Sequence, residues 1–155
     1  MTRYNRLYQL FLMTLLILML AACNSAAQQQ ATLSDIPTYE GARALNRGDN
    51  LLVDTLATTV EQMAKQEYDS TEVKRYEAPA GAQQNELYHF YAQQLAATGW
   101  QKTDRIEHDN PPVIIEVWTK GEGEDRQALF IGMANDPVAG NSAFFVTALS
   151  ADQIL

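Results

Sequence analysis

Cys23 is the residue of this chain whose chemistry is easiest to state, and it is the only cysteine. A cysteine thiolate is a strong soft nucleophile, so a suitable donor can alkylate it. Leu20, Ala21 and Ala22 come directly before it, and the two small residues leave an extended backbone open to a protease. The sequence thus places a modifiable thiol and a cleavable peptide bond at the same point.

Other residue types that perform chemistry are sparse. The two histidines, His89 and His108, lie on a predicted helix and in a predicted turn, with no serine or cysteine at a spacing typical of nucleophilic catalysis. No set of His, Asp and Glu has the spacing of a metal site. The acidic run 121–125 has carboxylates that suit calcium, but it lacks the calcium-loop pattern and favours a solvated hairpin tip. The sequence predicts no catalytic residue, no cofactor and no metal.

The first 22 residues have the composition of a secretory signal peptide. Arg3 and Arg6 are the only charges, residues 7–20 are almost wholly apolar, and Ala21 and Ala22 supply a small-residue exit. The apolar run is short for a membrane span, which needs roughly 20 residues. Two alternatives remain open, an uncleaved signal anchor and ordinary cleavage after Ala27.

The stretch Leu20-Ala21-Ala22-Cys23 resembles the lipobox of bacterial lipoproteins, which reads Leu, a small residue, Ala or Gly, then Cys. The resemblance implies that residues 1–22 are removed and that Cys23 carries a covalent lipid. Two or three acyl chains, at about 0.8 kcal/mol per buried CH₂, give stable anchoring. We therefore expect an extracytoplasmic protein, attached to a bacterial membrane through the lipid on Cys23.

The net charge of the chain limits the classes of partner that it can bind. The formal net charge is −8, and removal of the signal with Arg3 and Arg6 leaves −10. Such an acidic domain argues against binding to nucleic acid and against electrostatic adhesion to anionic lipid. The lipid on Cys23 is therefore expected to provide the membrane attachment.

The remaining length suits one domain with its own core. Residues 23–35, with Gln28, Gln29 and Gln30, are predicted to be the lipidated cysteine and a flexible tether. Residues 36–155 are predicted to form a single α+β domain.

Two helices are expected, over residues 51–66 and 83–98, because apolar residues recur there at helical spacing. Asp49 or Asn50 is expected to cap the first. Gly99 is expected to end the second in the left-handed conformation, with Trp100 packing back on Leu95.

Alternating and β-branched residues predict strands over 68–77, 100–107, 113–118, 128–134 and 143–150. The last four are joined by short loops and should form an antiparallel meander. The predicted fold is α+β, with an antiparallel sheet of four to five strands covered on one face by two helices. Val113, Ile115 and Val117 should face this core, with Glu116 and Trp118 on the outer side. An exposed Trp118 beside Glu116 would then indicate a partner surface, and Tyr88 and Trp118 could line a groove for a sugar or peptide.

A second resemblance covers most of the mature chain. The residues are Ile36-Pro37-x-Tyr39-x-Gly41-Ala42 and, later, Phe90-Tyr91-x₃-Leu95-x₃-Gly99-Trp100. They are similar to motifs of small uncharacterised bacterial envelope lipoproteins, although Glu40 stands where those have proline. These motifs concern turns, a helix face and a helix end, so the resemblance implies a fold and no activity.

The sequence therefore favours a lipid-anchored envelope protein that is a non-catalytic interaction or scaffold module, with another envelope protein as its partner. The alternative is a small-ligand-binding lipoprotein with a groove between helices and sheet. A hydrolytic enzyme ranks third, because the titratable groups that chemistry needs are missing.

Overall fold

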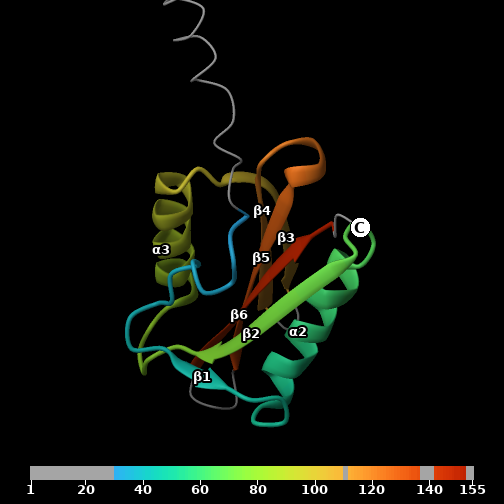
Figure 1. Ribbon diagram of the computed structural model, residues 1–155. Helices are drawn as coiled ribbons and strands as arrows, with labels where there is room; N and C mark the ends of the chain where they lie inside the picture. The colour runs from blue at the N-terminus through green and yellow to red at the C-terminus, as the bar shows by residue number, and fades with distance from the viewer. Residues whose placement is uncertain (1–29, 110–111, 137–141, 153–155) are drawn as a thin grey trace, which may run out of the picture.

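The computed structural model describes residues 30–109, 112–136 and 142–152, which fold as one antiparallel sheet between two helices (Figure 1). Cys23 and the predicted signal peptide lie outside the described residues. None of the described helices is long and apolar enough to cross a membrane.

The sheet has six strands in the order β1-β2-β6-β5-β4-β3, and every neighbouring pair is antiparallel. The elements, in chain order, are β1 (Arg43–Leu45), α2 (Leu51–Ala64), β2 (Ser70–Glu77), α3 (Gln84–Ala97), β3 (Gln101–Asp109), β4 (Pro112–Lys120), the 3₁₀ turn η1 (Gly123–Asp125), β5 (Gln127–Asp136) and β6 (Ser142–Ala151).

The predicted meander is confirmed, since β3, β4, β5 and β6 are consecutive neighbours in the sheet. The predicted turn over residues 108–112 is shorter than expected, because β3 runs to Asp109 and β4 begins at Pro112. The prediction of four to five strands missed β1, a three-residue strand that pairs with β2.

The prediction that both helices cover one face is wrong, because α2 and α3 lie on opposite faces (Figure 1). Leu129, Ile131 and Met133 of β5 belong to the cluster with α3, whereas Phe130 and Ala134 belong to the cluster with α2. The cause is visible in the sequence: β5 and β6 are apolar at nearly every position, as strands buried on both faces must be.

Local sequence signals explain where each helix begins and ends. The Asn50 side chain accepts a hydrogen bond from the Val53 N–H at 3.1 Å and caps α2. At the end of α3, the Trp100 N–H donates to the Leu95 carbonyl and the Gly99 N–H donates to the Ala96 carbonyl. Gly99 has φ of +85°. The predicted Schellman ending is therefore confirmed.

The folded part begins earlier than predicted. Leu33 is buried in the α3-side cluster, together with Ile36. The Ala31 N–H donates to Oε1 of Gln127 at 2.7 Å, and Nε2 of Gln127 donates to the Ala31 carbonyl at 2.9 Å. Residues 31–35 are thus packed against the domain and are not part of a free tether.

Candidate functional site

Glu116 is the most unusual side chain of the described residues, because it is a carboxylate with no exposed surface. Strand alternation places it on the α3 side of β4, between Ile115 and Val117, which face the other side. The expectation of an outer, solvated face for Glu116 is wrong, although the predicted alternation is right. The α3-side cluster covers this part of β4, so Glu116 lies in a buried environment there.

Two cations from the neighbouring strand β3 lie over Glu116. Arg105 pairs with Glu116 across the two strands, so both side chains leave the same face. Its Nη1 atom is 3.5 Å from Oε1 of Glu116, and Nζ of Lys102 is 3.6 Å from the same oxygen. The other oxygen, Oε2, has no hydrogen-bond partner among the described residues.

Tyr88 of α3 completes the cluster from above the sheet. Nζ of Lys102 donates to the Tyr88 hydroxyl at 2.7 Å. The Arg105 guanidinium lies 4.4 Å from the centre of the Tyr88 ring, and Nζ of Lys102 lies 5.1 Å from it. Arg105 is also paired with Glu107 on its own strand. Both cations are therefore fixed by several contacts while about a third of each side chain stays exposed.

The electrostatics of the cluster follow from burial. Burial raises the pKa of Glu116 above its ordinary value of 4.5, and the charges of Lys102 and Arg105 offset part of that rise. The hydrogen bond to Tyr88 raises the pKa of Lys102. We call Tyr88, Lys102, Arg105 and Glu116 the β3-edge cluster.

The other predicted residues are not gathered into one site. His89 is exposed on α3, with its ring 5.5 Å from that of Tyr88, and the side chain of His108 lies outside the described part. Trp118 is only 4% exposed, so the idea of an exposed tryptophan is wrong. The two apolar clusters occupy most of the space between the helices and the sheet, and a small cavity remains near the end of α2.

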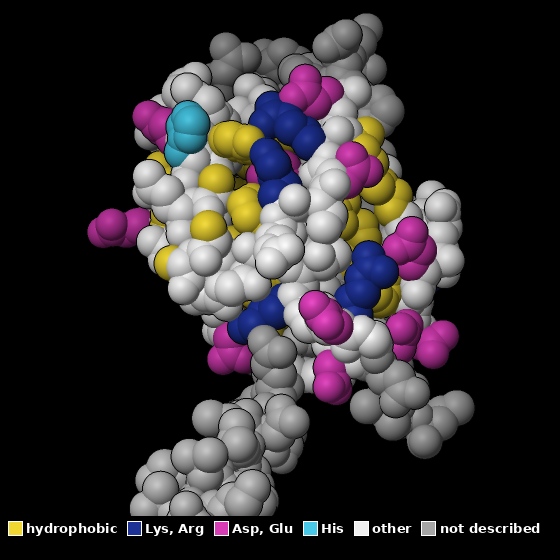
Figure 2. All heavy atoms as spheres, turned by 90° about the horizontal axis from the view of Figure 1, so that it is seen from above, with side chains coloured by type: hydrophobic (Ala, Val, Ile, Leu, Met, Phe, Trp, Pro, Cys, Tyr) yellow, Lys and Arg dark blue, Asp and Glu magenta, His cyan; other side chains and the backbone are white. Residues whose placement is uncertain are grey.

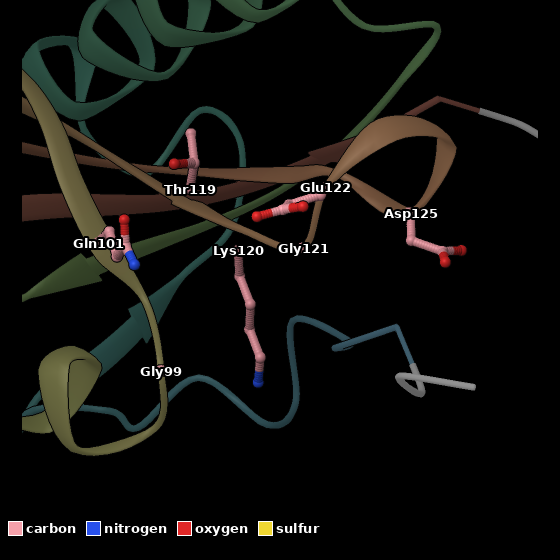
Figure 3. A pocket seen from close by; sticks show the side chains of 7 residues that line it. All are labelled: Gly99, Gln101, Thr119, Lys120, Gly121, Glu122 and Asp125. Atoms are coloured by element: carbon pink, nitrogen blue, oxygen red, sulfur yellow. The ribbon is translucent and has the colours of Figure 1, made fainter. Parts of the chain in front are cut away.

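The described residues form a polar cavity of about 400 Å³ at the β4–β5 hairpin (Figure 3). In Figure 3, Lys120 extends away from the sheet, Glu122 points towards Gln101 and Thr119, and Asp125 points outward from the loop. The acidic run 121–125 thus contributes to a hollow, as well as a hairpin tip. The described residues contain no group of three or more side chains placed to hold a metal ion.

A smaller cavity of about 240 Å³ lies between the end of α2 and the strands β3 and β4. Met63, Val117 and Phe130 supply its apolar side, and Asp104 and Arg126 are among its polar residues. Its volume is below the range of roughly 300–1,000 Å³ that is typical of small-molecule sites.

The chain matches no known protein family, no curated protein and no solved structure. The assignment of a function therefore rests on the residues and their geometry.

Sequence reasoning missed the β3-edge cluster, although part of its signal is present. Glu116 is a lone acid inside the apolar run 113–118, which is unusual for a strand that packs on both faces. Lys102 and Arg105 precede it in a strand that was predicted to be its neighbour. The missing piece was the register, which decides that these cations meet Glu116.

Proposed function

We propose that this chain is a lipid-anchored envelope protein whose folded domain is a non-catalytic interaction module. The observation that supports the proposal best is the β3-edge cluster, in which Lys102 and Arg105 are held over a buried carboxylate and a tyrosine ring. The cluster lies at the exposed edge of the sheet and not in a cleft.

Such a cluster suits protein recognition better than catalysis. Arginine and tyrosine are enriched among the residues that dominate protein–protein binding. Arg105 is already held by Tyr88, Glu107 and Glu116, so its side chain loses little conformational freedom when a partner binds it. The residues that a nucleophilic mechanism needs, a base beside a serine or cysteine, are not part of the cluster.

Membrane attachment is the second half of the proposal, and its support is the sequence. Cys23 follows a basic, apolar and small-residue leader that resembles a lipoprotein signal. The net charge of −8 leaves little electrostatic attraction to anionic lipid, so the lipid on Cys23 would hold the protein at the membrane.

Affinity capture from solubilised envelopes tests the interaction. We expect full-length lipidated protein to recover a defined partner, and Lys102→Ala with Arg105→Ala to reduce the recovered amount at least about tenfold, which is roughly 1.4 kcal/mol. Arg47→Ala, an exposed arginine in the turn before α2, is the matched control and should capture as the unmodified protein does. Equal capture by all variants would refute the role of the cluster.

The anchor is tested separately with Cys23→Ser, because serine does not accept the lipid. We expect this variant either to remain an uncut precursor or to leave the membrane fraction. Labelling with an acyl precursor should mark the unmodified protein and not the variant, and equal labelling of both would refute the anchor.

The alternative, a small-ligand-binding lipoprotein, is favoured by one observation, the polar cavity at the β4–β5 hairpin. Its mixture of Lys120 with Glu122 and Asp125 suits a small molecule that carries both charges. A thermal-shift screen with zwitterionic metabolites would test it. A compound that stabilises the unmodified protein and not Lys120→Met supports this function, and no stabilisation at millimolar concentration counts against it.

A further inference from the structure

Within the described part of the chain, the strand β3 forms one edge of the sheet and has a neighbour on one side only. It is nine residues long, whereas the opposite edge strand, β1, has three. A register shift interrupts its pairing between Lys102 and Asp104, and the pairing is then regular as far as Asp109. Among the described residues, 104–109 therefore form a regularly paired edge whose outer side another strand can join.

One hydrogen bond shows how this edge is occupied in the single chain. The Arg105 N–H donates to Oδ1 of the preceding residue, Asp104, at 2.7 Å. This N–H is therefore directed away from β4, and by alternation the Glu107 N–H is too. A strand that joins β3 would replace Asp104 as the partner of Arg105.

We propose that β3 pairs in antiparallel fashion with β3 of a second copy of this chain, about a two-fold axis at Ile106. This inference rests on the proposed function, because it names the partner of the interaction module. The argument that selects a second copy is the charge pattern along the strand.

In an antiparallel pair, directly opposite residues have their side chains on the same face. At a two-fold axis perpendicular to the sheet, a residue must therefore lie opposite the same residue of the second copy. An axis at Ile106 places Arg105 opposite Glu107 of the second copy, and Glu107 opposite Arg105. Both side chains are on the α3 face, since Arg105 pairs with Glu116 and Glu107 pairs with Ile114 in β4. The pairing would thus exchange the Arg105–Glu107 ion pair within each strand for two reciprocal ion pairs between the copies.

Two-fold axes at the neighbouring residues are unfavourable, because they place like charges opposite each other. An axis at Arg105 would place two arginines opposite each other, and an axis at Glu107 would oppose two glutamates. An axis at Asp104 would oppose two aspartates. Like charges directly opposite destabilise a strand pair, so the sequence of β3 selects Ile106 as the centre.

The other face of the strand is also suited to this contact. Ile106 pairs with Ile115 and is only half-buried, beside Val113 and Val117, which are likewise half-buried. Helix α2 packs mainly on β2, β5 and β6 and covers this part of the sheet less. Figure 2 shows Lys and Arg side chains and hydrophobic side chains side by side on one face of the molecule. The second copy would bury the two Ile106 side chains against each other.

The geometry agrees with attachment of both copies to one membrane. A two-fold axis perpendicular to the sheet keeps the α3 layers of the two copies on the same side. Leu33 and Ile36 belong to the α3-side cluster, so this segment of both copies would lie on that side. Ala31 is eight residues after Cys23, a length that reaches about 28 Å when extended.

Cysteine cross-linking in membranes tests the pairing with the full lipidated chain. Opposite residues of an antiparallel pair have Cα atoms about 4.5–5.5 Å apart, which suits a disulfide. We expect Ile106→Cys to give a covalent dimer on mild oxidation. Ala44→Cys, on the opposite edge of the same sheet, is the matched control and should stay monomeric.

A charge variant tests the register. Glu107→Lys, added to Ile106→Cys, should lower the cross-linking yield several-fold, because it would oppose Arg105 of the second copy. Glu72→Lys, an exposed acid on β2, should leave the yield unchanged. An unaltered yield with Glu107→Lys would overturn the proposed register.

The outcomes separate this inference from the proposed function. If Ile106→Cys links no better than Ala44→Cys, or links to a protein of another mass, pairing between copies is refuted. Capture that still depends on Lys102 and Arg105 would in that case leave the interaction module standing. If capture fails as well, both proposals fall.

Discussion

The two faces of the sheet are covered by side chains of different types. On the α2 side, Val53, Leu56 and Val60 pack against Val146 and other strand residues, and the layer is largely aliphatic. Aromatic rings are more numerous on the α3 side, where Tyr76 stacks on Phe145 with ring centres 4.8 Å apart and Tyr91 packs beside them. Both layers exclude water, so the difference lies in what else they hold.

Polar atoms are the difference. The described part of the chain has three buried side-chain polar atoms without a hydrogen-bond partner, and all lie on the α3 side: the Tyr91 hydroxyl, Nε1 of Trp118 and Oε2 of Glu116. Burial raises the pKa of Tyr91, so its hydroxyl stays protonated. The α2 side holds polar groups in ion pairs, such as Arg75 with Asp54 and Glu61, whereas the α3 side combines its packing with the polar cluster at the β3 edge.

The largest expected effect is on the aromatic side. Trp100→Ala removes a ring that is 4% exposed and should lower the free energy of unfolding by about 3–5 kcal/mol. Leu56→Ala on the aliphatic side should have a smaller effect, near the low end of the about 2–5 kcal/mol range for such truncations. Denaturant unfolding of both variants measures this, and a greater loss for Leu56→Ala would contradict the ranking of the faces.

A methyl group added on the aliphatic side tests how closely that face is packed. At Gly132 a β-carbon would lie 2.9 Å from Cγ2 of Val146 and 3.0 Å from Cδ1 of Leu56. Gly132→Ala should therefore cost about 1–3 kcal/mol. Leu56→Ala in the same chain should make room, so the double variant should lose less than the sum of the two single losses. Strict additivity would mean that the contact is slack.

Gly99 isolates backbone strain from packing on the aromatic side. Its φ is +85°, yet the nearest atom to an added β-carbon is Cε of Lys120 at 4.0 Å. Gly99→Val should lower the free energy of unfolding by about 1–2 kcal/mol through strain alone. Thermal melts would show this, and melting like that of the unmodified protein would mean that the end of α3 can rearrange.

The smallest effect, and the most specific, concerns Glu116. Because burial raises its pKa, the folded state binds this proton more tightly than the unfolded state does. The unmodified protein should lose stability as the pH rises from about 4.5 through the folded-state pKa. Glu116→Gln removes that dependence, so its stability relative to the unmodified protein should increase as the pH rises above about 4.5. Exposed Glu67→Gln is the control, and a similar change for both would exclude Glu116 as the source.

Local patterns predicted local structure well. The alternation of Val113, Ile115 and Val117 is confirmed, and so is the left-handed Gly99. The placement of the helices was not predicted although β5 and β6 are apolar on both faces, because an apolar run does not say which helix covers which face. β1 was missed because it is short and its first two residues are exposed.

The candidate site depends on distant contacts, which a single sequence does not reveal. Glu116 meets Lys102 and Arg105 only through the β3–β4 register, and the irregularity between Lys102 and Asp104 shifts that register by one residue. The burial of Leu33 is equally hard to predict, because Gln127, which holds this segment through Ala31, is 96 positions away from Ala31. Residues 31–35 were predicted to be part of the tether because the composition of this stretch is mainly polar.

The paired hydrogen bonds between Ala31 and Gln127 have a mechanical consequence. A pulling force on the N-terminal end reaches the domain first at these two bonds, which belong to one side chain and break together. Separation of residues 31–35 also requires Leu33 to leave the α3-side cluster, so the two hydrogen bonds and the burial of Leu33 together hold this segment against the domain. The two hydrogen bonds of Gln127 would break under tension and form again when the tension falls, while the central strand β5, on which Gln127 stands, stays paired.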